Sequence, residues 1–401
     1  MKRTGLLMFL AAASLSAANY DELKRDCLAM KEAFGPKTAV SCLTDIFTEK
    51  TLHPVIKSIA PGAGTGLGLG YKLDRPGDWR KTFTVNGAVS MRGAWVAETL
   101  FGVRRPNLAR WNKDNEDYAA RLYVRARGLP RMTYYGPGPD TSRANLVNFA
   151  ERDVFAGGDA LIPVAPWLGV GGVVEGIMPD ISGVHDGTVR SIEQYFSEST
   201  APGLYSQPTF LHTEAFVRPH HNYPFEFDGR VGFHFYHDTD TGHYSFRRFK
   251  ADVTHNIYPE RIRKGRPKRD SVLSIRGVVS LSDASATNAV PFYLQETLGG
   301  SDINNQPTLR GFADYRFRAP NLFLIQTMYE RRIWQYVGVL GFYDTGQAAM
   351  RKGDLSFGNM RHSFGFGISL WAESKVVFRA YIGLGSGEGR HNYFGLPAGT
   401  P

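Results

Sequence analysis

After its first twenty residues the chain lacks any long uncharged apolar run. A helix needs roughly 18 such residues to cross a bilayer. Although 42% of the residues are hydrophobic and only 21% are charged, this absence excludes a helical membrane protein. Any crossing of a membrane must therefore be made by strands.

Cysteine is almost absent, with only Cys27 and Cys42 in 401 residues, which excludes a disulfide-rich scaffold. In an oxidising periplasm a disulfide between the two is reasonable. Their neighbours recur at helical spacing on both sides of Gly35-Pro36. We predict a short, disulfide-linked helical segment over residues 19–50. Two free thiols on a loosely held tail are the alternative.

Motifs for catalysis are also missing. No Ser-His-Asp elbow, phosphate-binding glycine loop or paired zinc-ligand spacing occurs. The densest group of possible metal ligands is His220, His221, His234, His237, Asp238, Asp240 and His243. On a strand, however, His234 and His237 point to opposite faces. We therefore expect no enzyme activity, no cofactor and no metal site.

The N-terminus has the features of an export signal. Lys2 and Arg3 precede an apolar run over residues 5–13, and Ser16-Ala17-Ala18 supplies small residues for cleavage after Ala18. We predict a signal peptide over residues 1–18; the alternative, an anchor helix, would be too short to span comfortably.

The chain is basic, with a formal charge of +9. An exported chain rarely meets nucleic acid, so no such partner is expected. The densest basic run, residues 261–269, lies between two strand-like segments and contains two breakers. It is predicted to be a solvated periplasmic turn, and a contact with phospholipid head groups or another anion is the alternative.

Glycine and aromatic residues are abundant, with 44 Gly, 26 Phe and 19 Tyr, a mixture that suits strands, tight turns and aromatic girdles. From residue 51 onward, alternating segments are separated by Gly, Pro, Asp and Asn. Sixteen are predicted: 52–60, 63–73, 80–91, 93–105, 117–133, 144–164, 167–180, 206–218, 226–238, 243–257, 270–284, 321–333, 336–348, 361–373, 375–386 and 390–396.

An even number of long segments favours an all-β, sixteen-stranded antiparallel transmembrane barrel over residues 51–401. The long connections 181–205 and 285–320 are expected outside the cell, and short turns such as 164–167 in the periplasm. A soluble β-sandwich or propeller is the rival, but no repeat at propeller spacing occurs. The first segment holds Pro54 and is followed directly by Pro61, and the last is short and ends near Gly395, so few ladder hydrogen bonds can close the sheet.

The long connection 285–320 carries a distinctive group of residues. Leu298-Gly299-Gly300-Ser301-Asp302 is followed by the run from Leu309 to Arg318, which contains Arg310-Gly311-Phe312, and a later strand reads Gly341-Phe342-Tyr343-Asp344-Thr345-Gly346-Gln347. An arginine at the tip of a glycine-flanked loop suits a bidentate contact with a carboxylate. The alternative is a solvated Arg310 in a mobile loop.

These motifs resemble the surface-antigen barrel shared by BamA, TamA and the two-partner-secretion transporters, over about residues 51–396 and most specifically from residue 290. The opening pair of segments also looks similar to the first strands of BamA. The resemblance implies that the loop folds back into the lumen and that Arg310 pairs with Asp344. Gly311, Phe312 and Gly346 are implied as packing positions.

The sequence departs from that family in three ways. The family often has a glutamate on the strand after the loop, where this chain has Met328; Glu330, two residues on and on the same face, is a weak substitute. The last strand does not end in an aromatic residue, because Tyr393-Phe394 precedes Gly395. Between Ala18 and residue 51 there is no room for a POTRA domain.

We therefore expect a POTRA-less BamA-like barrel in the bacterial outer membrane, acting in protein insertion, translocation or envelope biogenesis. It would contact outer-membrane lipid and could require a periplasmic POTRA-bearing or chaperone partner. A passive porin or anion-preferring channel is the second hypothesis, faintly favoured by the positive charge. An outer-membrane phospholipase-like enzyme is the third, with no visible nucleophile to support it.

Overall fold

The computed structural model describes residues 51–104, 119–185, 187, 189–221, 225–259, 270–372 and 375–395. The predicted signal peptide, the helical segment with Cys27 and Cys42, and the basic run 261–269 lie outside these residues. Within them, no helix has the length and apolar character that crossing a bilayer requires.

Sixteen strands form one antiparallel sheet in which each strand pairs with the next along the chain, apart from the step from β11 to β14. They are β1 (Leu52–Ser58), β2 (Thr65–Arg75), β3 (Arg80–Ser90), β4 (Trp95–Arg104), β5 (Ala120–Tyr134), β6 (Val147–Ala165), β7 (Leu168–Gly183), β8 (Phe210–His221), β9 (Phe225–Asp238), β10 (Phe246–Ile257), β11 (Ser271–Ala284), β14 (Asn321–Arg332), β15 (Val337–Ala349), β16 (Arg361–Ala372), β17 (Lys375–Gly385) and β18 (Gly389–Gly395). The sixteen predicted strands are thus confirmed.

The remaining described elements are short and lie in connections. A two-stranded sheet joins β12 (Glu296–Leu298) to β13 (Phe317–Ala319), inside the connection from β11 to β14. The 3-10 helices are η2 (Arg143–Asn145), η3 (Ile192–Gln194), η4 (Phe292–Leu294), η5 (Lys352–Asp354) and η6 (Phe357–Asn359). β12 and β13 are not predictable from the sequence, because three-residue strands are too short to show alternation.

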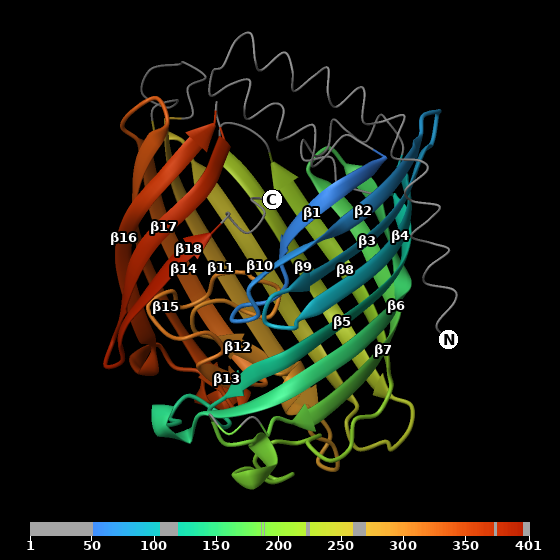
Figure 1. The fold of residues 1–401 in the computed structure, drawn as a ribbon, viewed down its shortest axis with the longest axis vertical. Helices are drawn as coiled ribbons and strands as arrows, with labels where there is room; N and C mark the ends of the chain where they lie inside the picture. The colour runs from blue at the N-terminus through green and yellow to red at the C-terminus, as the bar shows by residue number, and fades with distance from the viewer. Residues whose placement is uncertain are drawn as a thin grey trace.

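The sheet curls into a barrel, with the connection between β11 and β14 lying within it (Figure 1). Because successive strands are antiparallel, the connections alternate between two ends. One end carries the tight turns β2–β3, β6–β7 and β14–β15, and we call it the turn end. The other, the loop end, carries the long connections β7–β8 and β11–β14, as the sequence predicted.

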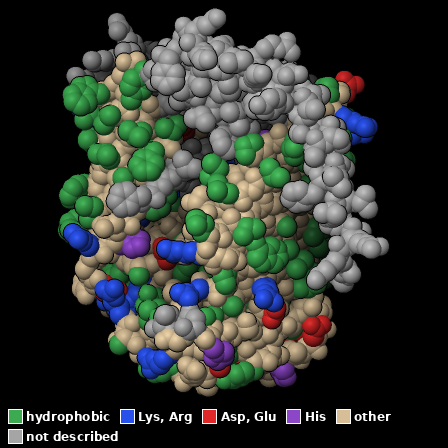
Figure 2. Space-filling view, in the orientation of Figure 1, with side chains coloured by type: hydrophobic (Ala, Val, Ile, Leu, Met, Phe, Trp, Pro, Cys, Tyr) green, Lys and Arg blue, Asp and Glu red, His purple; other side chains and the backbone are tan. Residues whose placement is uncertain are grey.

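The wall of the barrel is apolar outside and polar inside. On β2, Leu67 and Leu69 are exposed while Gly66 and Gly70 are buried. Inward-facing buried residues of other strands include Glu214, Gln326 and Ser363. In Figure 2 hydrophobic side chains spread over the wall of the face shown, and charged ones gather toward the loop end. This inverted pattern is the one that a barrel in lipid requires.

Tryptophans mark the turn end. Trp79, Trp167 and Trp334 lie in the three tight turns named above, and all three are exposed. Tryptophan is enriched where a membrane meets water, because its ring is apolar and its N–H is polar. The row is consistent with the turn end lying at one bilayer interface.

The main hydrophobic core sits at the loop end rather than in the middle of the barrel. Tyr134 and Phe149, from the ends of β5 and β6, pack against Phe292 with ring centroids 5.2 and 5.1 Å apart. Phe196 from the β7–β8 connection stacks edge-on against Tyr134 at 4.9 Å. The long strands β5–β7 therefore continue into a packed cap of loops.

The two edges of the sheet are β1 and β18, each seven residues long. They face one another on the near side of the barrel in Figure 1. The sequence predicted a closed sheet with few ladder hydrogen bonds at this seam. That expectation of closure was wrong for the described residues, in which no ladder pairs β1 with β18. Pro54 lies in β1 and has no N–H to donate, which is one physical reason.

Candidate functional site: a loop held inside the barrel

The connection between β11 and β14, residues 285–320, folds on itself before it meets the wall; we call it the lumen loop. Gly300 N donates to Leu309 O at 2.9 Å, and Tyr315 N donates to Gly299 O at 3.2 Å. Gly299 has a φ of 112°, and a side chain there would lie 2.4 Å from Ala313 O. The two sequence runs singled out above therefore fold into one compact unit.

Arg310 of the lumen loop contacts Asp344 of β15. Its Nε donates to Asp344 Oδ2 at 2.9 Å, its Nη2 donates to Oδ1 at 2.5 Å, and its backbone N donates to Oδ2 at 3.0 Å. The exposed fraction is 5% for Arg310 and 0% for Asp344. The structure thus brings together the two residues that the family resemblance paired, and it places neither in solvent.

The surroundings of this pair supply further partners. Ser363 Oγ on β16 donates to Asp344 Oδ2 at 3.2 Å, and the Arg310 guanidinium lies 3.9 Å from the centre of the Phe342 ring. Arg310 Nη1 lies 3.5 Å from Met328 Sδ. Met328 occupies the position where the family often has a glutamate, so a weak sulfur acceptor stands where a second carboxylate would be.

Glu330 does not join the Arg310 contact, although the sequence analysis grouped it with the loop tether. Its carboxylate is fully buried and accepts from Arg379 Nη2 of β17 at 2.7 Å. Glu330 and Met328 do share the inward face of β14, as expected from their spacing. The assignment of Glu330 to the tether was wrong. Glu330 lies two residues nearer the turn end than Met328, and Arg379 neutralises its charge there.

Gly311 lets the loop backbone touch the barrel wall. A Cβ on Gly311 would lie 2.4 Å from the Leu384 carbonyl carbon of β17, and a Cβ on Gly383 would lie 2.5 Å from Arg310 O. Phe312 is buried and stacks edge-on against Phe317 with ring centroids 5.3 Å apart. Gly346 is buried on β15, where a Cβ would lie 2.7 Å from Phe323 O. All three implied packing positions are therefore tightly packed.

A second ion cluster holds the start of the lumen loop. Lys250 Nζ of β10 lies 3.0 Å from both oxygens of Glu296, and Arg248 Nη1 lies 3.3 Å from Glu296 Oε1. Burial alone would raise the pKa of Glu296, but the positive charges of Lys250 and Arg248 outweigh burial and lower this pKa to about 2. Glu296 therefore stays ionised inside the barrel over the whole physiological range.

The lumen loop contacts both edges of the open seam. Toward β1, Asn305 Nδ2 donates to Ser58 O at 3.1 Å and Tyr315 OH donates to Pro61 O at 3.3 Å. Toward β17 and β18, Arg316 Nε donates to Glu388 Oε2 at 2.8 Å. The loop therefore bridges two edges that no described ladder joins.

Some of these partners left no signal in the sequence. Arg379 lies on β17 and Glu388 in the turn between β17 and β18, and only the three-dimensional structure shows what they face. Arg316 and Glu296 lie inside or beside the motif that drew attention to the loop, but their partners are 72 and 46 residues away in sequence. Nothing short of the fold identifies such pairs.

Fold and site together define a class: an outer-membrane-type β-barrel whose lumen holds one of its own loops through a buried arginine–aspartate pair. The structure has the fold of the BamA barrel, as the resemblance implied. It is similar to BamA from Haemophilus ducreyi lacking POTRA domains 1–3, with a TM-score of 0.54 and 11% identity over 90% of this chain and 76% of that chain.

Two further solved structures are similar at lower scores. CdiB from Acinetobacter baumannii has a TM-score of 0.48 and 11% identity over 84% of this chain and 56% of that one. CdiB from Escherichia coli has a TM-score of 0.49 and 10% identity over 88% of this chain and 62% of that one. No protein-family model and no curated protein sequence matches the chain.

Proposed function

We propose that the protein is an outer-membrane barrel that inserts or translocates other proteins, without catalytic activity of its own. The observation that carries the proposal is the combination of an anchored lumen loop and two unpaired edge strands beside it. Free edges offer backbone N–H and C=O groups to an incoming strand. The likeness to the BamA barrel supports this function through the shared fold.

The seam is the part of the wall where a client would enter. Only β1 and β18 have unpaired backbone groups along a full strand in the described sheet. In lipid such groups are costly unless something pairs with them. A client strand that pairs there lowers this cost, so the free edges favour insertion over a passive wall.

The proposal is tested by cross-linking the seam. A panel of cysteine pairs is placed across β1 and β18, and purified protein in lipid vesicles is assayed for acceleration of the folding of an unfolded β-barrel client. We expect seam disulfides to abolish the acceleration and dithiothreitol to restore it. The matched control joins Ile56 to Leu67, register partners within the β1–β2 hairpin, and should leave the activity unchanged. Full activity with a locked seam would refute insertion through it.

A passive porin or anion-preferring channel is the second candidate, favoured by the formal charge of +9. The lumen loop argues against it, because residues 285–320 occupy the pore. Planar-bilayer conductance separates the two functions. Large steady openings in the unmodified protein support the porin, whereas small irregular openings that grow on Arg310→Ala support an assembly barrel.

The proposal also includes a periplasmic POTRA-bearing or chaperone partner and a surrounding shell of outer-membrane lipid. Purification of the intact protein from membranes under mild detergent, followed by mass spectrometry, tests the partner. A POTRA-containing chain recovered in constant ratio is the expected result. Adding the recovered partner to the vesicles should accelerate client folding beyond the rate that the barrel alone gives, and no added acceleration would contradict a role for the partner.

A further inference from the structure

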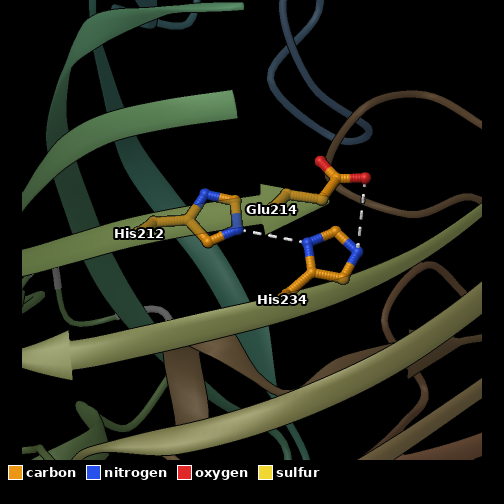
Figure 3. A group of neighbouring side chains, drawn as sticks. All are labelled: His212, Glu214 and His234. Atoms are coloured by element: carbon orange, nitrogen blue, oxygen red, sulfur yellow. Dashed lines mark hydrogen bonds and ion pairs between the residues drawn. The ribbon is translucent and has the colours of Figure 1, made fainter. Parts of the chain in front are cut away.

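A group of histidine and glutamate side chains lies on the inner face of β8 and β9, next to β10, whose Arg248 and Lys250 hold Glu296 of the lumen loop. Glu214 of β8 is the register partner of His234 of β9, and His212 lies two residues before Glu214 on the same face. Figure 3 shows the His234 ring between the His212 ring and the Glu214 carboxylate. Three potential metal-ligating side chains thus meet at one place.

The distances are close to those within a metal site. His212 Nε2 lies 3.1 Å from His234 Nδ1, and one ligand atom from each of the three residues lies within 4.8 Å of the others. Metal–nitrogen bonds of about 2.0–2.1 Å in a tetrahedron place ligand atoms roughly 3.3 Å apart. The two imidazole nitrogens already have this spacing. The Glu214 oxygen reaches it when its side chain rotates and brings the oxygen closer to the two nitrogens.

Glu175 of β7 fixes the tautomer of His212. Its Oε1 lies 2.8 Å from His212 Nδ1, and its Oε2 accepts from Tyr123 OH at 2.6 Å. A carboxylate only accepts hydrogen bonds, so Nδ1 carries the hydrogen and the lone pair of Nε2 points at His234. A carboxylate behind the outer nitrogen of a ligating histidine is a common second layer of metal sites.

Arg230 contacts both oxygens of the Glu214 carboxylate. Its Nη2 donates to Oε2 at 2.6 Å and its Nε donates to Oε1 at 2.8 Å, while Oε1 also lies 3.7 Å from His234 Nε2. Gly232 makes room, because a side chain there would lie 2.7 Å from Glu214 Oε1. A metal that binds Glu214 therefore replaces one of the two Arg230 hydrogen bonds, and Arg230 keeps the other.

The ligating side chains are buried, but the site lies beside an exposed side chain. His212 and Glu214 have exposed fractions of 5% and 7%, whereas the neighbouring Arg230 side chain is 43% exposed to the lumen. With neutral imidazoles, the two carboxylates Glu175 and Glu214 are balanced by Arg230 and by the one positive charge that Arg248 and Lys250 leave over after pairing with Glu296.

We propose that His212 Nε2, His234 Nδ1 and one carboxylate oxygen of Glu214 bind a divalent first-row metal of the zinc class in the barrel lumen, with Glu175 positioning His212. Imidazole nitrogen with one carboxylate oxygen suits Zn²⁺ rather than Ca²⁺ or Mg²⁺. Three protein ligands leave the fourth position to solvent. Binding replaces the hydrogen between the two imidazoles, which moves to His234 Nε2, so both rings bind the metal in their neutral form.

The test uses the full chain in detergent, without a histidine tag, after treatment with a chelator. Titration with Zn²⁺ by calorimetry should give one strong site, and Ca²⁺ should not compete. His212→Gln and His234→Gln should each weaken binding at least about 100-fold, and Glu175→Gln about 10-fold. His237→Gln, an exposed histidine on the opposite face of β9, is the matched control and should not change it.

Each outcome decides the proposal. Absence of a one-to-one Zn²⁺ site in the unmodified protein overturns it, and so does a site that survives both histidine substitutions. Should a variant fail to show the heat-modifiable gel mobility of a folded barrel, the unmodified protein is titrated with Co²⁺. Four-coordinate d–d absorption bands that Zn²⁺ displaces support the site, and their absence refutes it.

Discussion

The barrel contains two groups of buried charges that differ in what they connect. Arg310 and Asp344 join the lumen loop to the wall, across 34 residues of sequence and between elements that no ladder links. His212, Glu214 and His234 join strands that the β8–β9 ladder already holds in register. The first group fixes the position of the loop, whereas the second joins strands whose relative position the ladder already fixes.

The largest expected difference comes from breaking the loop pair. Arg310→Ala leaves the fully buried Asp344 without its cation, which should lower the free energy of unfolding by about 3–5 kcal/mol. Urea titration in lipid vesicles measures it. Lys352→Ala breaks an exposed pair with Asp283, whose side chains are 46% and 67% exposed, and should change stability by less than about 1 kcal/mol. Equal effects would show that the loop pair is not structural.

A smaller loss is expected from separating the loop backbone from β17. Gly311→Ala introduces a Cβ 2.4 Å from the Leu384 carbonyl carbon, and overpacking of this kind costs about 1–3 kcal/mol. Proteolysis of the 285–320 loop should become faster. Gly353→Ala is the control, because nothing lies within 4 Å of its added Cβ. A Gly311→Ala variant as protected as the unmodified protein would contradict the close contact.

Acid should loosen the other end of the lumen loop. The folded pKa of Glu296 is depressed, to about 2, so its contribution to stability is present above the ordinary glutamate value and is lost as pH falls toward about 2. The fraction of open loop in residues 285–320, measured by hydrogen exchange corrected for the intrinsic exchange rate at each pH, should rise over that interval. Lys250→Met should move the rise to higher pH. An exchange profile that is flat between pH 5 and 2.5 would contradict this anchoring role.

The smallest effect on stability is expected for Arg230 and Glu214, beside His212 and His234. A double-mutant cycle of Arg230→Gln with Glu214→Gln should give a coupling energy of about 1 kcal/mol or less, because Arg230 is 43% exposed. The corresponding cycle for Arg310 and Asp344 should give several times more. Equal coupling energies would contradict this difference between the two groups.

The sequence predicted the barrel well because a strand in lipid must alternate. The alternation of Leu67 and Leu69 with Gly66 and Gly70 indicates which side chains face outward, whatever residues lie on the neighbouring strands. The Arg310–Asp344 contact was also predictable, but only through the family resemblance. From the residues alone, a solvated Arg310 in a mobile loop was the favoured outcome.

Pairings across strands could not be predicted, because they depend on register. His234 was considered with His237 and Asp238, its neighbours in sequence, whereas its neighbours in space are His212 and Glu214 of another strand. Glu330 was assigned to the loop, but Arg379 reaches it from β17. A shift of one residue in any ladder would have reversed each of these outcomes.

The bridging position of the lumen loop has a consequence for how the chain reaches its native state. Forming the barrel brings the edges β1 and β18, the first and last strands, to the same side of the molecule (Figure 1) without a described ladder between them, and the search for so distant an arrangement is slow. The loop divides that search into two parts: Asn305 lies 247 residues from Ser58, and Arg316 only 72 from Glu388. The late hairpin can therefore dock first, and the first strand then meets a surface already assembled to receive it.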